Sequence, residues 1–257
     1  MTARIITFVN QKGGVGKTTT AVNVAAAAGR RGRRVLLVDL DPQANASSAA
    51  GVVDAGEPGI YEMLMEDEEP TACVVELPAE SMSVVPSSPA LAGAEVELVP
   101  VMARERRLVH ALSALRGSYD LILIDCPPSL GLLTINALTA ADNVVIPVQC
   151  EYMALEGLSR LTETLELVRR NLNPGLTILG LVLTMFDGRT RLAQQVVDEV
   201  RSHFKQVVFT TVIPRSVRLS EAPSHGQSIF RYDPGGRAAN AYEALADELL
   251  ERVGNSP

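Results

Sequence analysis

The sequence predicts a doubly wound α/β fold, in which a mostly parallel sheet is covered by helices on both faces. Short runs of apolar and β-branched residues recur along the chain, and segments with apolar residues at helical spacing lie between them. Near-continuous apolar strands are typical of parallel sheets that are buried on both faces. Alternation of such strands with helices favours a layered α/β domain with right-handed crossovers.

The expected strands cover residues 4–9, 35–38, 83–85, 121–124, 144–148, 178–183 and 207–213. The expected helices cover residues 18–31, 104–116, 132–140, 155–171, 192–204 and 238–253. The stretch 44–101 is the least regular, with six prolines and an acidic run, so it predicts short helices and loops on the rim. We therefore expect a single domain over residues 1–257.

Composition limits the class of protein. At 257 residues and 47% hydrophobic content, the chain can bury one large core. It has no apolar run long enough to cross a membrane and no signal-peptide pattern, so we expect a cytoplasmic protein. Three scattered cysteines, Cys73, Cys126 and Cys150, favour buried reduced thiols over disulfides or a metal site.

Charge is unevenly distributed. The net charge is −7, yet residues 186–240 hold eight Lys/Arg against five Asp/Glu, a balance of +3, which leaves −10 for the rest. A local basic patch on an acidic body is therefore possible. Only three lysines stand beside twenty arginines, and two of them, Lys12 and Lys17, share one glycine-rich loop. A compact ammonium suits a phosphate ligand.

The segment from Gln11 to Thr18 follows an apolar strand and precedes a helix. In that context glycines let backbone N–H groups surround phosphates, and the helix N-terminus adds its positive dipole. Lys17 is then expected to reach the β- and γ-phosphates, and the Thr18 hydroxyl to bind Mg²⁺. The usual first glycine of this phosphate-loop pattern is replaced by Gln11.

Carboxylates end two further apolar strands. Asp39 and Asp41 lie two residues apart, on one side of a strand end, where open α/β sheets bind ligands. A buried strand also closes on Asp125, as a Walker-B element requires, so Asp125 is expected in the Mg²⁺ shell. The turn that follows, with Pro127 and Pro128, is a candidate switch.

The sequence KGGVGKT, which follows Gln11, resembles the phosphate loop of the deviant Walker-A ATPases. These are P-loop NTPases and include ParA/Soj, MinD and the nitrogenase iron protein. With DLDPQ, IDCPPSLG, residues 213–226 and the YDP at 232–234, the resemblance to Soj-type ParA proteins spans nearly the whole chain. It implies that Lys12 crosses a dimer interface to the partner's phosphates and that Asp41 orients the attacking water. It also implies that Gly13 sits where two subunits approach closely.

The motifs and the resemblance together give the candidate site. The catalytic candidates are Lys12, Lys17 and Asp41. The nucleotide-binding candidates are Lys12, Gly13, Gly14, Val15, Gly16, Lys17, Thr18, Thr19, Met185, Pro214 and Arg215, with the adenine near Thr184 and Met185. The Mg²⁺ candidates are Thr18, Asp39 and Asp125. The DNA-binding candidates are Arg189, Arg218 and Arg215. His225 is expected to pack within its loop.

The function implied by the resemblance is a slow, partner-stimulated Mg²⁺-dependent ATPase. Its ATP-bound homodimer is expected to bind double-stranded DNA without sequence preference and to drive chromosome or plasmid partition with a ParB/Spo0J-type partner. The first expected strand begins at residue 4, so no separate N-terminal DNA-binding domain is expected. A MinD-like membrane ATPase is the alternative, although the last predicted helix is acidic. An iron–sulfur ATPase and a small-molecule ligase or kinase remain further readings.

Overall fold

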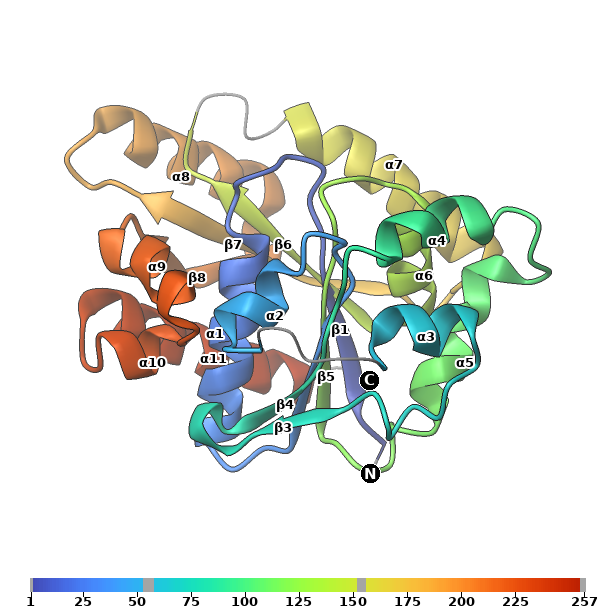
Figure 1. The fold of residues 1–257 in the computed structure, drawn as a ribbon. Coiled ribbons are helices and arrows are strands. Elements are labelled where there is room, and N and C mark those ends of the chain that lie inside the picture. The colour runs from blue at the N-terminus through green and yellow to red at the C-terminus, as the bar shows by residue number, and fades with distance from the viewer. Residues whose placement is uncertain (1, 53–57, 152–155, 255–257) are drawn as a thin grey trace.

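The computed structural model describes residues 2–52, 58–151 and 156–254 and consists of one central sheet with helices on both sides (Figure 1). The eight strands of the described residues lie in the order β3-β4-β2-β5-β1-β6-β7-β8. Every neighbouring pair is parallel except β3 and β4. The predicted fold class, a doubly wound and mostly parallel α/β sheet, is confirmed.

The strands are β1 (Arg4–Phe8), β2 (Val35–Asp39), β3 (Val75–Leu77), β4 (Met82–Val85), β5 (Leu121–Asp125), β6 (Asn143–Gln149), β7 (Thr177–Phe186) and β8 (Val208–Pro214). The helices are α1 (Lys17–Arg30), α2 (Asn45–Ala49), α3 (Ile60–Met65), α4 (Leu91–Glu97), α5 (Arg107–Ser113), α6 (Leu132–Ala140), α7 (Glu156–Asn171), α8 (Arg191–Phe204), α9 (Val217–Glu221), α10 (Ile229–Tyr232) and α11 (Arg237–Gly254). Short 3₁₀ turns are η1 (Pro78–Glu80), η2 (Arg104–Arg106), η3 (Lys205–Val207) and η4 (Ala222–His225).

The seven predicted strands and six predicted helices are all present, with ends that move by a few residues. Residue 155, the predicted start of α7, lies outside the described residues. The irregular stretch holds short helices, as expected, and also β3, which the sequence did not predict. β3 has only three residues, none of them buried, so it lacks the apolar run that marks the other strands.

Two apolar cores, one on each face of the sheet, join the sheet to its two layers of helices. Side chains from one face of the sheet pack against α3 to α8. Side chains from the other face pack against α1, α2, α10 and α11. The helices α3 to α7 accordingly lie to the right of the sheet in Figure 1, and α1, α2 and α11 lie to its left. Because central strands such as β2 and β5 are buried throughout, their sequences are continuously apolar.

Strand register brings the candidate residues together. Phe8 at the end of β1 pairs with Asp125 at the end of β5, and Asp125 in turn pairs with Asp39 at the end of β2. The phosphate loop leaves β1 at this same edge. Three neighbouring strands therefore deliver the loop and the carboxylates to the carboxyl edge of the sheet, where open α/β sheets bind their ligands.

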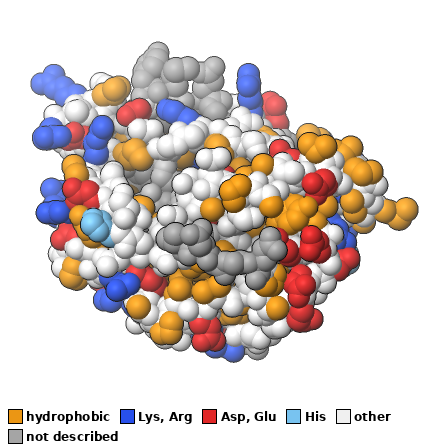
Figure 2. All heavy atoms as spheres, in the orientation of Figure 1, with side chains coloured by type: hydrophobic (Ala, Val, Ile, Leu, Met, Phe, Trp, Pro, Cys, Tyr) orange, Lys and Arg blue, Asp and Glu red, His pale blue; other side chains and the backbone are white. Residues whose placement is uncertain are grey.

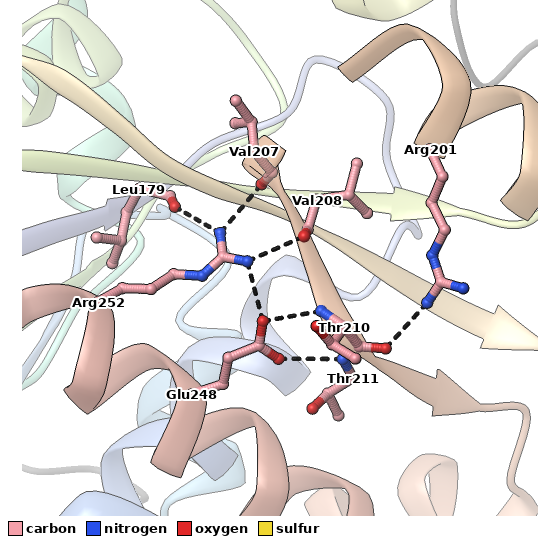
Figure 3. Close-up of polar contacts among 8 residues, drawn as sticks. All are labelled: Leu179, Arg201, Val207, Val208, Thr210, Thr211, Glu248 and Arg252. Atoms are coloured by element: carbon pink, nitrogen blue, oxygen red, sulfur yellow. Dashed lines mark hydrogen bonds and ion pairs between the residues drawn. The ribbon is translucent and has the colours of Figure 1, made fainter. Parts of the chain in front are cut away.

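The sheet ends at β8, whose outer edge is covered by side chains of α8 and α11 (Figure 3). Glu248 accepts hydrogen bonds from the N–H groups of Thr210 and Thr211, at 2.8 and 3.0 Å. Arg201 donates to the Thr210 carbonyl at 2.9 Å. Exposed edge strands are templates for pairing with other chains, so these contacts satisfy backbone groups that would otherwise be free.

The last helix contributes its apolar face to the core. Tyr242, Leu245 and Leu249 of α11 are buried against the layer that contains α1. The apolar face of α11 is thus already occupied within the described chain. Among the described residues, no helix is both long and apolar enough to cross a membrane.

Candidate nucleotide-binding site

The phosphate loop joins the end of β1 to the start of α1. Gly14 and Gly16 have φ angles of +72° and +87°, in the left-handed region that glycine adopts without strain. Gly16 is the N-cap of α1, and its carbonyl accepts hydrogen bonds from the Thr20 N–H and hydroxyl. The free N–H groups of the first turn of α1 therefore open toward the loop, which suits an anionic ligand.

The two loop lysines have different environments. Lys17 is 7% exposed, and burial lowers the pKa of its ammonium, while the nearby Asp125 carboxylate opposes that change. Its Nζ lies 3.5 Å from the carbonyl oxygen of Lys12. The Lys12 side chain is exposed, and its backbone N–H donates to Asn10. Lys17 thus points inward to the site, and Lys12 is free to reach outward.

Asp125 is the most unusual carboxylate of the site. Its side chain is fully buried, and neither oxygen has a hydrogen-bond partner among the described residues. Burial and the neighbouring Asp39 carboxylate raise the pKa of Asp125 well above its ordinary value, although the Thr18 hydroxyl is near enough to lower it in part. Buried carboxylate oxygens without partners are rare, and an ion bound beside them is one physical explanation. Their position beside Thr18 fits a divalent cation.

Asp39 and Asp41, at the end of β2, have different environments. Asp39 is fully buried, and its oxygens accept from the N–H and hydroxyl of Ser47, both at 2.7 Å, and from the Asp41 N–H at 3.2 Å. Burial raises the pKa of Asp39 to about 6 in spite of these bonds. Asp41 accepts from the Gln43 N–H at 3.0 Å and faces the cleft described next. Asp39 therefore ties α2 to the strand end that presents Asp41.

A cleft of about 550 Å³ lies over these groups. The predicted residues that line it are Gly13, Gly14, Gly16, Lys17, Thr18, Thr19, Asp41 and Met185. The predicted residues that do not line it are Lys12, Val15, Asp39, Asp125, Pro214 and Arg215. A second cavity, of about 680 Å³, lies between α7 and α8 and contains none of the predicted site residues.

The cleft also has a wall that sequence reasoning missed. Leu219 from α9, three residues of η4 and Gln227 face the phosphate loop, together with Asn23 of α1 and Ser48 of α2. Their role depends on contacts between segments about two hundred residues apart, which no local pattern reveals. The family motif at 213–226 did mark this segment, with Pro214 and Arg215 as nucleotide-binding candidates and Arg215 and Arg218 as DNA-binding candidates, but not the residues that line the cleft.

The end of β7 forms a further border of the cleft. Met185 lines it with a φ of +53°, a left-handed conformation that is uncommon for a residue with a side chain. Thr184 is 2% exposed, and its hydroxyl donates to the Val15 carbonyl at 2.8 Å. The Arg215 N–H donates to the Phe186 carbonyl, which holds the ends of β8 and β7 together. The adenine assignment to this region stays a prediction.

The predicted DNA-binding arginines are exposed. The side chain of Arg189 is 88% exposed and forms a bidentate pair with Asp187, at 2.6 and 2.8 Å. Arg218 on α9 pairs with Glu221 at 3.0 Å and lies over the ring of Tyr232, and Arg215 is exposed. Figure 2 shows Lys and Arg side chains gathered at the left of the molecule, where Figure 1 places α8, α9 and α10. His225 stacks on Tyr232, as expected for a packing residue.

Comparison with known proteins places this site in a family. A family model described as an AAA domain matches residues 3–178. The chain is 56% identical to the sporulation initiation inhibitor protein Soj of Bacillus subtilis, over 96% of this chain and 98% of that protein. It is 54% identical to the chromosome partitioning protein ParA of Myxococcus xanthus, over 97% of this chain and 88% of that protein.

Solved structures agree with these relatives in fold. The cobyrinic acid a,c-diamide synthase of Mycobacterium smegmatis, solved with a bound ATP analog and magnesium, is 38% identical with a TM-score of 0.87, over 98% of this chain and 96% of that one. The identity to this synthase is lower than the identity to the two partition proteins. The phosphate loop, the carboxylates at the strand ends and these similarities agree: the chain belongs to the Soj/ParA family of chromosome-partitioning ATPases.

Proposed function

We propose that this ATPase is a nucleotide-gated switch. ATP and Mg²⁺ bring two subunits together, the dimer binds double-stranded DNA without sequence preference, and slow hydrolysis, stimulated by a ParB/Spo0J-type partner, releases it. This cycle drives chromosome or plasmid partition in the cytoplasm, with the protein held on the nucleoid through its DNA contacts.

The position of α9 carries the proposal. Arg218, the DNA-binding candidate, and Leu219, which lines the nucleotide cleft, are neighbours on this one short helix. A bound nucleotide that presses on Leu219 therefore acts on the same element that presents Arg218. Phosphate contacts by arginines add affinity without sequence preference. Nucleotide state and DNA affinity are thereby linked through one helix.

The groups of the cleft suit Mg·ATP chemistry. Lys17 and the first-turn N–H groups of α1 would bind the phosphates, and Thr18 and Asp125 would hold Mg²⁺, with Asp39 behind them. The bound Mg²⁺ would supply positive charge to the transferring phosphoryl group. Asp41, facing the cleft, would orient the attacking water. The relative solved with an ATP analog and magnesium supports this cofactor pair.

Two loop residues support the dimer. A Cβ built on Gly13 meets no atom within 4 Å, and its φ does not lie in the left-handed region. Nothing inside the described chain therefore requires glycine there, and the open space beside it leaves room for a second subunit to approach closely. Lys12 is exposed beside it and would reach the partner's phosphates, where a second cation stabilises transition-state charge.

The MinD-like alternative finds less support. A peripheral membrane helix needs a free apolar face and a basic polar face. The apolar face of α11 is buried in the core, and its acidic side chains Glu243 and Asp247 pair with Arg30 and Arg31. The helix therefore lacks the free apolar face and the basic polar face that binding to anionic lipid needs.

Binding to a long DNA duplex of arbitrary sequence tests the proposal. The wild type and Arg218→Glu are compared with ATP·Mg²⁺, with ADP·Mg²⁺ and without nucleotide, at two salt concentrations. We expect the wild type to bind only with ATP and to bind more weakly at high salt. We expect Arg218→Glu to lose at least tenfold in affinity, because each subunit of the dimer replaces a phosphate contact with repulsion.

Arg33→Glu is the matched control, since it makes the same charge change on an exposed side chain at the opposite edge of the sheet, before β2. It should retain DNA affinity within about threefold. Equal binding by the wild type in all nucleotide states, or an equal loss in both variants, would contradict the gated switch.

A further inference from the structure

Thr184 is a polar side chain that the nucleotide chemistry described above does not use. It lies near the end of β7 and is 2% exposed, although the cleft opens at its neighbour, Met185. Its hydroxyl donates to the carbonyl oxygen of Val15 at 2.8 Å, across 169 positions of sequence. This hydrogen bond joins the end of β7 to the phosphate loop.

The peptide that Thr184 holds lies in the phosphate loop. The Val15 carbonyl and the Gly16 N–H belong to one planar trans peptide, so they point in opposite directions. A hydroxyl that fixes the carbonyl toward β7 thereby turns the Gly16 N–H away from β7. Gly16 lines the cleft, so an N–H turned away from β7 can face a phosphate bound there.

The Thr184 side chain also has a fixed place. A Cβ built on Gly16 would lie 3.8 Å from Cβ and Cγ2 of Thr184, so the methyl group packs against this glycine. The Thr184 carbonyl accepts from the Cys150 N–H at 3.0 Å, which anchors its backbone to the end of β6. The next residue, Met185, is held at a φ of +53°. Rigid neighbours on both sides keep the hydroxyl pointed at the loop.

We propose that Thr184 is a positioning residue of the nucleotide site: its hydroxyl holds the Val15–Gly16 peptide so that the Gly16 N–H points at the bound phosphates. The residue reads neither base nor sugar with its side chain. The proposal depends on nucleotide binding alone and is independent of DNA binding, dimerisation and the partner protein.

Three substitutions separate the hydroxyl from the methyl group. Thr184→Val keeps the shape and removes the donor, Thr184→Ser keeps the donor and removes the methyl, and Thr184→Ala removes both. Thr139→Val is the control, because Thr139 is 7% exposed, donates its hydroxyl to the Ile135 carbonyl at 2.7 Å and does not line the cleft. It repeats the loss of a buried hydroxyl away from the site.

Fluorescence titration with N-methylanthraniloyl ADP and ATP gives the dissociation constants of the full chain, and thermal unfolding without nucleotide gives the stability of each variant. We expect Thr184→Val to weaken both nucleotides about tenfold, as the loss of one hydrogen bond to a positioned group implies. Thr184→Ser should remain within about threefold of the wild type, and Thr139→Val should match it. In steady state, the Val variant should raise KM more than it lowers kcat.

Several results would overturn the proposal. These are nucleotide affinity of Thr184→Val within twofold of the wild type, equal losses in the Val and Ser variants, or an equal loss in Thr139→Val. If Thr184→Val does not fold, the Ser and Ala variants decide, because they differ only in the hydroxyl and equal affinities would refute the role. Titration of the wild type shows separately whether the chain binds nucleotide. A wild type that does not bind would contradict the proposed function, whereas a wild type that binds with an unaffected Thr184→Val variant would contradict only the role of Thr184.

Discussion

Asp41 and Asp125 lie near the buried ammonium of Lys17 at the phosphate loop, and Asp39 lies near both of these carboxylates. Burial lowers the pKa of Lys17 and raises those of Asp39 and Asp125. The donors of Ser47 satisfy Asp39, whereas the oxygens of Asp125 have no partner among the described residues. Ionisation of Asp125 is therefore unfavourable in the nucleotide-free site, and a cation bound beside it would offset that cost.

We therefore expect Asp125 to lower the stability of the nucleotide-free protein while it contributes to the binding of Mg·nucleotide. In nucleotide-free protein, Asp125→Asn should raise the free energy of unfolding at pH 8 by about 1–3 kcal/mol, because the folded variant neither buries a charge nor binds a proton at this position. The folded-state pKa of Asp125 lies above its unfolded value, so wild-type stability is lost as the pH rises through that range. The gain from Asp125→Asn should accordingly shrink as the pH falls toward 5.

Urea unfolding at several pH values measures this gain, and thermal unfolding with ADP and Mg²⁺ measures binding. Asp125→Asn should lose most of the stabilisation that Mg·nucleotide gives the wild type. A variant that is less stable than the wild type at pH 8 without nucleotide would show that the Asp125 carboxylate has a stabilising partner.

At the scale of elements, side chains of α11 form hydrogen bonds with the backbone at the β8 edge of the sheet. Arg252 donates to the carbonyls of Leu179, Val207 and Val208, at 2.9, 3.2 and 2.9 Å (Figure 3). Its guanidinium group stacks over the ring of Phe209. It also pairs with Glu248, whose pKa is lowered overall, against the effect of burial, by the N–H groups of Thr210 and Thr211. One helix thus satisfies backbone groups of both β7 and β8.

Replacing Arg252 with Met should keep the length of the side chain and lower the free energy of unfolding by about 2–4 kcal/mol, because buried carbonyls lose their donor. Nucleotide affinity should stay within about threefold, since Arg252 does not line the cleft. Urea unfolding and nucleotide titration measure the two quantities. Arg237→Met, at an exposed position of the same helix, is the control and should change stability by under about 0.5 kcal/mol.

How much of this architecture the sequence predicts depends on the range of the contacts. Continuous apolar runs predicted seven strands, and the phosphate loop and Asp41 were located from local patterns, because periodicity and motif spacing are properties of neighbouring residues. β3 was missed since it is short and not buried. The wall formed by Leu219 and η4 and the contact between Thr184 and Val15 were missed because they join segments that are distant in sequence.

At the scale of the whole molecule, the cleft and the basic surface share α9, and Lys12 and Gly13 of the phosphate loop are exposed. This arrangement connects three events in the proposed cycle: ATP binding, dimerisation and DNA binding. Asp41 stands at the step that ends the cycle, because hydrolysis would remove the γ-phosphate that the two subunits share. Blocking that step should hold the molecule in its dimeric state.

The molar mass of Asp41→Ala in ATP·Mg²⁺, measured by light scattering after gel filtration, tests this account most directly. We expect the mass of two chains with ATP and of one chain with ADP. Adding Gly13→Val should return the ATP-bound protein to one chain, because the new side chain fills the space needed by the partner. An Asp41→Ala protein that binds ATP but keeps the mass of one chain would contradict the ATP-gated dimer.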